Sequence, residues 1–126
     1  MESEPPSIDV AGALTQISLE MWKLLRAFER ALADLPDDKA SKRAAQYRYS
    51  KGRLEAVLDG AGMRLLTFEG QNFSAHLPVS PMNADEIDNP DEAFVESTIE
   101  PTIVGQDLVL HTGKVMLSGG ANVSRD

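Results

Sequence analysis

The chain has 126 residues and a formal net charge of −8 at pH 7, with an isoelectric point near 4.7. This length allows one domain or two small lobes, and the hydrophobic fraction of 42% is enough for a packed core. The acidic balance argues against a general affinity for nucleic acid or for anionic membranes. Because the sequence has no cysteine, disulfides, thiolate metal sites and a cysteine nucleophile are excluded.

The charge is divided unevenly along the chain. Residues 1–62 contain 9 Lys or Arg and 10 Asp or Glu, a net charge of −1, whereas residues 63–126 contain 3 and 10, a net charge of −7. This change predicts a boundary between two lobes near Gly62, and we expect the helices before it to fold without the second lobe. No apolar run approaches the roughly 20 residues that span a bilayer, and the N-terminus lacks a signal-peptide core. A cytoplasmic protein is the simplest interpretation.

The first predicted element is a long amphipathic helix. Residues 1–8 have two acids, two prolines and little to bury, so we expect them to be disordered, with Asp9 or Ser7 as the N-cap of the helix that follows. Over residues 14–35 apolar side chains recur at steps of three and four, which is a heptad seam and not the alternation of a strand. Pro36 ends the helix. The seam positions are Leu14, Ile17, Met21, Leu24, Phe28, Ala31 and Leu35.

A second helix is predicted from Asp38 to Gly60, where the same spacing continues. The short link between the helices predicts an antiparallel hairpin. Because two seams leave one apolar face uncovered, we expect two copies to pair into a four-helix bundle. The residues expected in the core of this homodimer are Leu14, Ile17, Met21, Leu24, Phe28, Ala31, Leu35, Tyr47, Leu54 and Leu58.

The second helix is also basic. Between Lys39 and Arg53 it has six basic residues and no acidic one. Such runs are usually solvated helix faces, and Glu20, Glu29 and Asp34 of the first helix offer ion-pair partners for them. The alternative is a basic docking surface for an acidic partner.

From Met63 onward the chain changes to short apolar runs separated by turn residues, which is the pattern of an all-β lobe. Residues 64–68 and 73–79 predict a hairpin around a glycine-containing turn. A final apolar hairpin is expected around Thr112 and Gly113. The other predicted strands are residues 94–99 and 102–104, separated by Pro101, and residues 108–110 and 114–117.

The acidic segment 83–93 is predicted to be a loop, and its spacing matches no calcium-binding loop. The fold class that follows is α+β, an antiparallel two-helix hairpin followed by a small all-β lobe. Its predicted parts are a disordered N-terminus at residues 1–8, a helical dimerisation domain at 9–62, a small β domain at 63–118 and a disordered tail at 119–126.

Histidine is the remaining candidate for catalysis or metal binding. His76 and His111 could together form a zinc site with carboxylates, or either could form a catalytic triad with Ser74, Ser80 or the acidic loop. No nucleophile elbow, phosphate-binding loop, dinucleotide fingerprint or zinc-protease motif accompanies them. Isolated histidines near strand ends are usually structural or exposed. We therefore expect no enzymatic activity, no metal and no other cofactor.

The order of these elements resembles the GrpE family of nucleotide exchange factors, which serve DnaK-type chaperones. In that family a helix with a Leu-Glu-Arg and alanine pattern begins a bundle, and this sequence has LLRAFERAL at residues 24–32. The family's second helix leads to a leucine and a glycine, similar to residues 54–62. Its Gly-x-Phe-Asp-Pro motif resembles residues 69–77, and its last hairpin resembles residues 110–115. The resemblance covers about residues 14–118.

The sequence also departs from the family's pattern. Ser74 and Ala75 stand where the family has aspartate and proline, Pro78 stands near its histidine, and His111 stands where it has arginine. Only 13 residues precede the seam, so the family's long N-terminal coiled coil is not expected.

The resemblance implies a homodimeric cochaperone that binds the nucleotide-binding domain of a DnaK-type chaperone and promotes ADP release. The β lobe would contact the chaperone, and the candidate contact residues are Phe73, His76, His111 and Lys114. The alternative is a dimeric interaction or scaffold module with the same architecture and no exchange activity.

Overall fold

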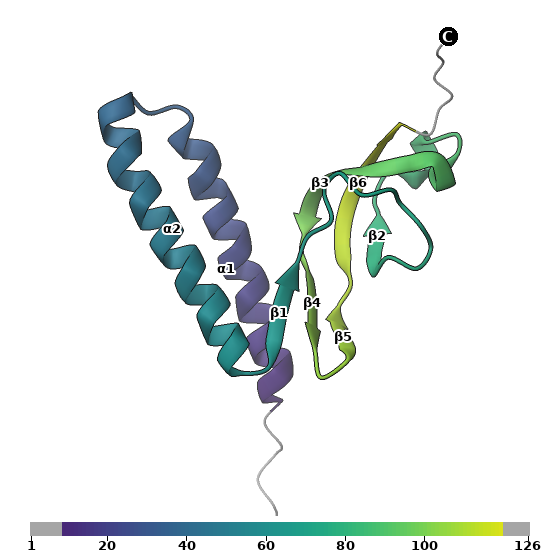
Figure 1. The fold of residues 1–126 in the computed structure, drawn as a ribbon, viewed down its shortest axis with the longest axis horizontal. Helices are drawn as coiled ribbons and strands as arrows, with labels where there is room; N and C mark the ends of the chain where they lie inside the picture. The colour runs from purple at the N-terminus through teal and green to yellow at the C-terminus, as the bar shows by residue number, and fades with distance from the viewer. Residues whose placement is uncertain (1–8, 120–126) are drawn as a thin grey trace, which may run out of the picture.

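A computed structural model describes residues 9–119, so the predictions for residues 1–8 and 120–126 lie outside the described part of the chain, whereas Gly119, the first residue of the predicted disordered tail, ends the last strand. Two helices come first and six short strands follow, which confirms the predicted α+β fold with a helical hairpin and a β lobe. Figure 1 shows the hairpin on one side and the strands on the other, with β1 (Met63–Leu66) next to the lower part of the helices. Within residues 9–119, no helix combines the length and the apolar character needed to cross a membrane.

Helix α1 (Val10–Leu32) begins at a side-chain cap, because the backbone N–H of Gly12 donates to Asp9 Oδ1 over 2.8 Å. It ends three residues earlier than predicted. The N–H groups of Asp34 and Leu35 bond to the carbonyls three residues back, so the last predicted turn is a tighter turn that leads into Pro36. Helix α2 (Asp37–Gly60) follows directly, antiparallel to α1.

The strands form two three-stranded sheets. In the first sheet β4 (Thr102–Gly105) lies between β1 (Met63–Leu66) and β5 (Leu108–His111), and both pairings are antiparallel. In the second sheet β6 (Gly113–Gly119) lies between β2 (Val79–Pro81), which is parallel to it, and β3 (Ala93–Glu100), which is antiparallel.

The predicted hairpin of residues 64–68 and 73–79 is wrong. The first of these segments forms β1, which pairs with β4, and the end of the second forms β2, which pairs with β6. The intervening residues lie along β3 instead, where the N–H of Gly70 bonds to the Val95 carbonyl and the N–H of Phe73 to the Ala93 carbonyl, both over 2.8 Å. These bonds occupy the backbone groups that a local hairpin would have used.

The final hairpin predicted around Thr112 and Gly113 is also wrong, since β5 and β6 belong to different sheets. The chain changes sheet at Gly113, where a Cβ would lie 2.6 Å from Thr102 Oγ1 and 2.9 Å from the Glu100 carbonyl oxygen. The tight hairpin lies one strand earlier, between β4 and β5. Its two turn residues have positive φ, 54° at Gln106 and 64° at Asp107, as a two-residue hairpin turn requires.

Each sheet has its own apolar core. The first core joins Leu19 of α1 and Leu58 of α2 to Met63 and Ile103 of the first sheet. The second core lies in the second sheet, where loop side chains such as Phe73 and Ile87 pack against Val79, Ala93, Val95, Val115 and Leu117. Packing therefore crosses the charge boundary at Gly62, and the helices and the first sheet share one core.

The acidic segment 83–93 contains two single-turn 3₁₀ helices, η1 (Ala84–Glu86) and η2 (Pro90–Glu92). Its start is fixed by the buried side chain of Asn83. The Asn83 Nδ2 donates to the Leu117 carbonyl over 3.0 Å, and the Leu117 N–H donates to Asn83 Oδ1 over 2.9 Å. The side-chain amide of Asn83 thus makes the two hydrogen bonds with the Leu117 backbone that a residue of a neighbouring strand would otherwise make.

Candidate functional site

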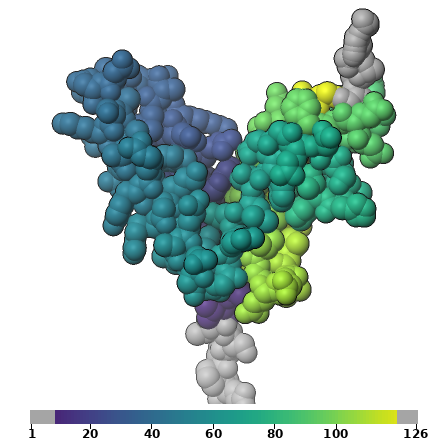
Figure 2. All heavy atoms as spheres, viewed as in Figure 1, coloured from purple at the N-terminus to yellow at the C-terminus, as the bar shows by residue number. Residues whose placement is uncertain are grey.

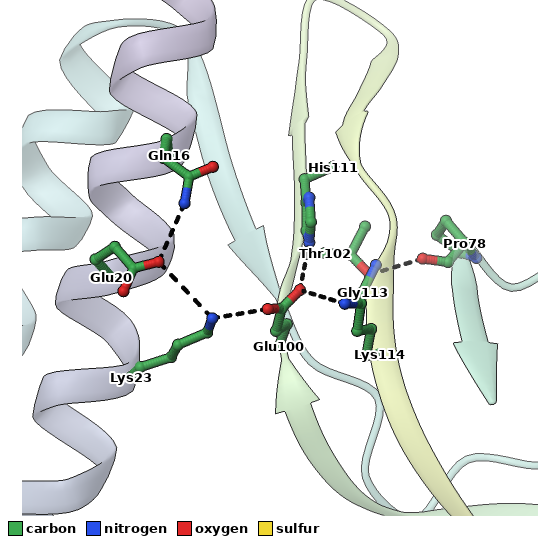
Figure 3. A network of polar contacts seen from close by, with 9 residues as sticks. All are labelled: Gln16, Glu20, Lys23, Pro78, Glu100, Thr102, His111, Gly113 and Lys114. Carbon is green, nitrogen blue, oxygen red and sulfur yellow. Dashed lines mark hydrogen bonds and ion pairs between the residues drawn. The ribbon is translucent and has the colours of Figure 1, made fainter. Parts of the chain in front are cut away.

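The most densely connected polar group of the fold is Glu100, the last residue of β3. Its carboxylate is 11% exposed and lies where helix α1 meets the two sheets. Oε2 lies 2.8 Å from Lys23 Nζ, and Oε1 lies 2.9 Å from His111 Nε2 and 3.8 Å from Lys114 Nζ. We call these four residues the Glu100 cluster; Figure 3 shows them converging on the carboxylate.

The partners of Glu100 come from three different elements. Lys23 projects from α1, His111 ends β5 of the first sheet, and Lys114 is the second residue of β6 in the second sheet. On α1 the contacts continue outward, because Lys23 Nζ also lies 3.8 Å from Glu20, which accepts a bond from Gln16. The cluster therefore links the helical hairpin to both sheets.

A second polar bridge lies beside the cluster, where Figure 3 shows Thr102 joined across the start of β6 to Pro78. The Thr102 hydroxyl donates to the Pro78 carbonyl over 2.7 Å and accepts from the Gly113 N–H over 3.2 Å. Because Thr102 is almost fully buried, these bonds satisfy the hydroxyl at the point where the chain passes between the sheets.

The contacts keep Glu100 ionised. The hydrogen bond from Lys23 lowers the pKa of Glu100 from its ordinary value of 4.5, against the opposing effect of burial, and the bond from His111 lowers it further. The same contact with Glu100 raises the pKa of Lys23 above its ordinary value of 10.5. An ionised carboxylate held between cations is suited to fixing the relative position of elements and unsuited to donating a proton.

Residues 9–119 offer no group of three or more His, Asp or Glu side chains placed to hold a metal ion. The two histidines lie apart, and only His111 belongs to the Glu100 cluster. His76 lies exposed in the β1–β2 connection, where its backbone N–H bonds to Ser74 Oγ, whereas His111 is half-buried beside Glu100.

The predicted partner-contact residues do not form one surface. His111 and Lys114 come together at Glu100, whereas Phe73 is half-buried against the second core and His76 lies in the loop. Sequence reasoning missed both Glu100 and Lys23. The available signal was an acidic residue next to Pro101, at the end of a strand that otherwise alternates into a core.

The predicted bundle-core residues occupy two faces. On α2, Leu58 is buried and Tyr47 and Leu54 are half-buried. On α1 the inward side is made by other residues, with Ser18, Leu19 and Leu25 buried. Four heptad positions face outward: Ile17 is 62%, Met21 40% and Leu24 65% exposed, and Ala31 is exposed. Phe28 and Leu35 are half-buried, and Leu14 is half-buried against the first core.

This outward row of α1 is an uncovered apolar surface. We call it the α1 stripe; its members are the exposed Val10, Ile17, Met21 and Leu24 and the half-buried Phe28, whereas Leu14 packs against the first core. Exposed leucine and isoleucine side chains at heptad spacing are typical of a helix that pairs with another helix.

A cleft of about 530 Å³ lies between the hairpin and β1. Its wall includes Trp22 and Tyr47. The guanidinium of Arg26 lies over the Trp22 ring, 5.2 Å from the ring centroid. Burial raises the pKa of the Tyr47 hydroxyl, and Glu29 raises it further. The cleft is visible as the notch between the two halves of the molecule in Figure 2, and its charged rim contains both signs in equal number.

No family model, curated protein or solved structure matches the chain.

Proposed function

We propose that the chain is a homodimeric cochaperone of the GrpE type, which binds the nucleotide-binding domain of a DnaK-type chaperone in the cytoplasm and promotes ADP release. The observation that carries the proposal is the arrangement in Figure 1. A helical hairpin with an uncovered apolar stripe supports a β lobe that extends away from it, and the second sheet of this lobe has a core of its own. This is the division into dimerisation and contact parts that the sequence resemblance implies.

The dimer part of the proposal rests on the α1 stripe. Its apolar members lie at positions 10, 17, 21, 24 and 28, so the stripe runs along one side of the helix for about 27 Å at 1.5 Å per residue. Pairing it with the same stripe of a second copy buries the surface by twofold symmetry, and the two hairpins together then form a four-helix bundle.

The exchange mechanism requires no catalytic residue. A protein promotes ADP release when it binds the open, nucleotide-poor state of the chaperone better than the closed state, because only differential affinity shifts a conformational equilibrium. The β lobe is the part with free surface for this contact. Leu108 and Val109 on β5 are 61% and 50% exposed, and Phe94 and Ile99 on β3 are 40% and 41% exposed.

The test is the rate of labelled ADP release from the DnaK-type chaperone of the same host, measured by stopped flow. We expect the wild type to accelerate release, and His111→Ala/Lys114→Ala to accelerate it less, because this pair helps to hold the β lobe through Glu100. Arg64→Ala, an exposed change on β1, is the control and should behave as the wild type.

The outcomes separate the proposal from its alternative. If the wild type neither binds the chaperone nor accelerates release, the exchange function is wrong and the dimeric scaffold remains. If the wild type and the double variant are equally active, the chaperone contact does not depend on the Glu100 cluster.

A further inference from the structure

Helix α2 carries cations without partners. Between Lys39 and Arg53 there are six basic residues and no acidic one. The ion pairs found within residues 9–119 all involve Lys23, His111 or Lys114, so none of these six has a carboxylate within 4.0 Å in the described part of the chain. The interpretation that they pair with Glu20, Glu29 and Asp34 of the first helix is therefore wrong for the single chain.

Most of these cations lie on one side of the helix. Steps of three and four connect them with two exposed apolar residues, Tyr49 at 65% and Val57 at 51% exposure. Tyr47, Leu54 and Leu58 point inward instead. We call the outward row the α2 basic stripe; its members are Lys39, Lys42, Arg43, Gln46, Tyr49, Arg53 and Val57, all of which are exposed.

We propose that the α2 basic stripe docks an acidic polypeptide segment of a partner protein. The charge distribution of the chain favours this ligand and its position. Residues 63–126 have a net charge of −7, and the segment 83–93 alone has five acidic residues, so an acidic segment is repelled by the β lobe and attracted to α2. This surface lies on the helical hairpin, so the proposal goes beyond the contact suggested for the β lobe.

The apolar members of the stripe distinguish a polypeptide from a plain polyanion. Tyr49 and Val57 offer side-chain area that an acidic peptide with an apolar residue covers, while the four cations pair with its carboxylates. The row from residue 39 to residue 57 is about 27 Å long, which corresponds to roughly eight extended residues. A nucleic acid strand longer than this row would continue onto the acidic remainder of the protein.

The probe is a fluorescent peptide of about eight residues, glutamates with a central leucine, with binding followed by anisotropy in the full chain. At about 10 mM ionic strength, where charges act over about 30 Å, we expect saturable binding that weakens strongly at about 150 mM. Lys42→Glu/Arg43→Glu should weaken it by about tenfold or more. Tyr49→Ala should weaken the binding that remains at the higher ionic strength, because its contact is apolar.

The matched control is Arg48→Glu/Arg64→Glu, which changes the net charge by the same amount at exposed residues outside the stripe. At about 10 mM ionic strength it should weaken binding less than Lys42→Glu/Arg43→Glu, because its charges lie farther from the peptide. At about 150 mM, where the Debye length is about 8 Å, it should stay within about twofold of the wild type.

Four results would overturn the proposal. They are no binding by the wild type at low salt, equal loss in the control, tighter binding of a thymidine oligonucleotide of the same charge, and a change of oligomeric mass in Lys42→Glu/Arg43→Glu. The third would make the stripe a nucleic-acid site, and the fourth would make it part of the interface between copies. Because ADP release is measured separately, a failure here and a failure of the exchange function are distinguishable.

Discussion

The carboxylate of Glu100 connects three elements because three structural constraints meet at one residue. Pro101 ends β3, Gly113 allows β6 to pass close to it, and the register of β3 with β6 places Lys114 opposite Glu100. Lys23 then reaches it from α1. A buried carboxylate is costly without partners, so this site depends on all of its cations.

We predict that Glu100→Gln lowers the free energy of unfolding by about 1–2 kcal/mol at neutral pH, because Lys23 and His111 then face a neutral amide instead of a carboxylate. The measurement is urea denaturation followed by circular dichroism. Glu96→Gln, an exposed change on the same strand, is the control and should differ little from the wild type.

The stabilisation that the Glu100 charge contributes should decrease at acidic pH. Because the pKa of Glu100 is lowered in the folded state, its contribution is fully present above the ordinary value of 4.5 and is lost as the pH falls through the folded pKa. The difference between wild type and Glu100→Gln should therefore shrink below about pH 4.5. A difference that is constant from neutral to strongly acidic pH would show that the charge of Glu100 is not responsible.

At the scale of elements, the two helices could be predicted and the pairing of the strands could not. The seam spacing, the Asp9 cap and Pro36 are local signals, and local signals decide where a helix begins and ends. Five of the six strands lie near their predicted positions, whereas only Val79 of the predicted segment 73–79 belongs to β2. The partners of the strands depend on where the chain changes sheets. That point is set by contacts between Gly113 and the residues around Pro101, which lie far apart in the sequence.

The heptad seam of α1 predicts the helix but not the packing of the helix. Its spacing correctly indicates an apolar side of α1, but it does not say which partner covers that side. Within the single chain, Ser18, Leu19 and Leu25 make the buried side, and the α1 stripe stays exposed.

We predict that Leu24→Glu converts a dimer into a folded monomer. Leu24 is 65% exposed in the single chain, so the change costs little within the chain but places two charges in a paired α1 stripe. Light scattering at micromolar concentration gives the mass, and circular dichroism checks the fold. Val109→Glu, at a 50% exposed apolar position on β5, should leave the mass unchanged. A monomeric mass for the wild type would disprove the dimer itself.

At the scale of the whole molecule, charge and packing divide the chain at different places. Net charge changes near Gly62, whereas the first core continues across it from Leu19 and Leu58 to Met63 and Ile103. The separation in packing lies between the two sheets, where Pro101 and Gly113 carry the chain from one core to the other. The net charge of a segment depends mainly on its exposed residues, and only the fold shows which side chains share a core.

The charge boundary predicts that the helices fold without the second lobe, whereas the shared first core predicts that they are destabilised without it. A chain that ends at Gly62 loses the partners of Leu19 and Leu58, which are 3% and 1% exposed in the full chain. We expect its helices to be less stable by about 2–4 kcal/mol, the cost of opening a cavity beside large aliphatic side chains. Thermal unfolding followed at the helical circular dichroism band measures this loss.

Val115→Ala in the full chain is the comparison, because it weakens only the second core and should leave the helical signal intact. A shortened chain that keeps the helix content and melting temperature of the full protein would show that the hairpin folds alone and that the shared core contributes little to it.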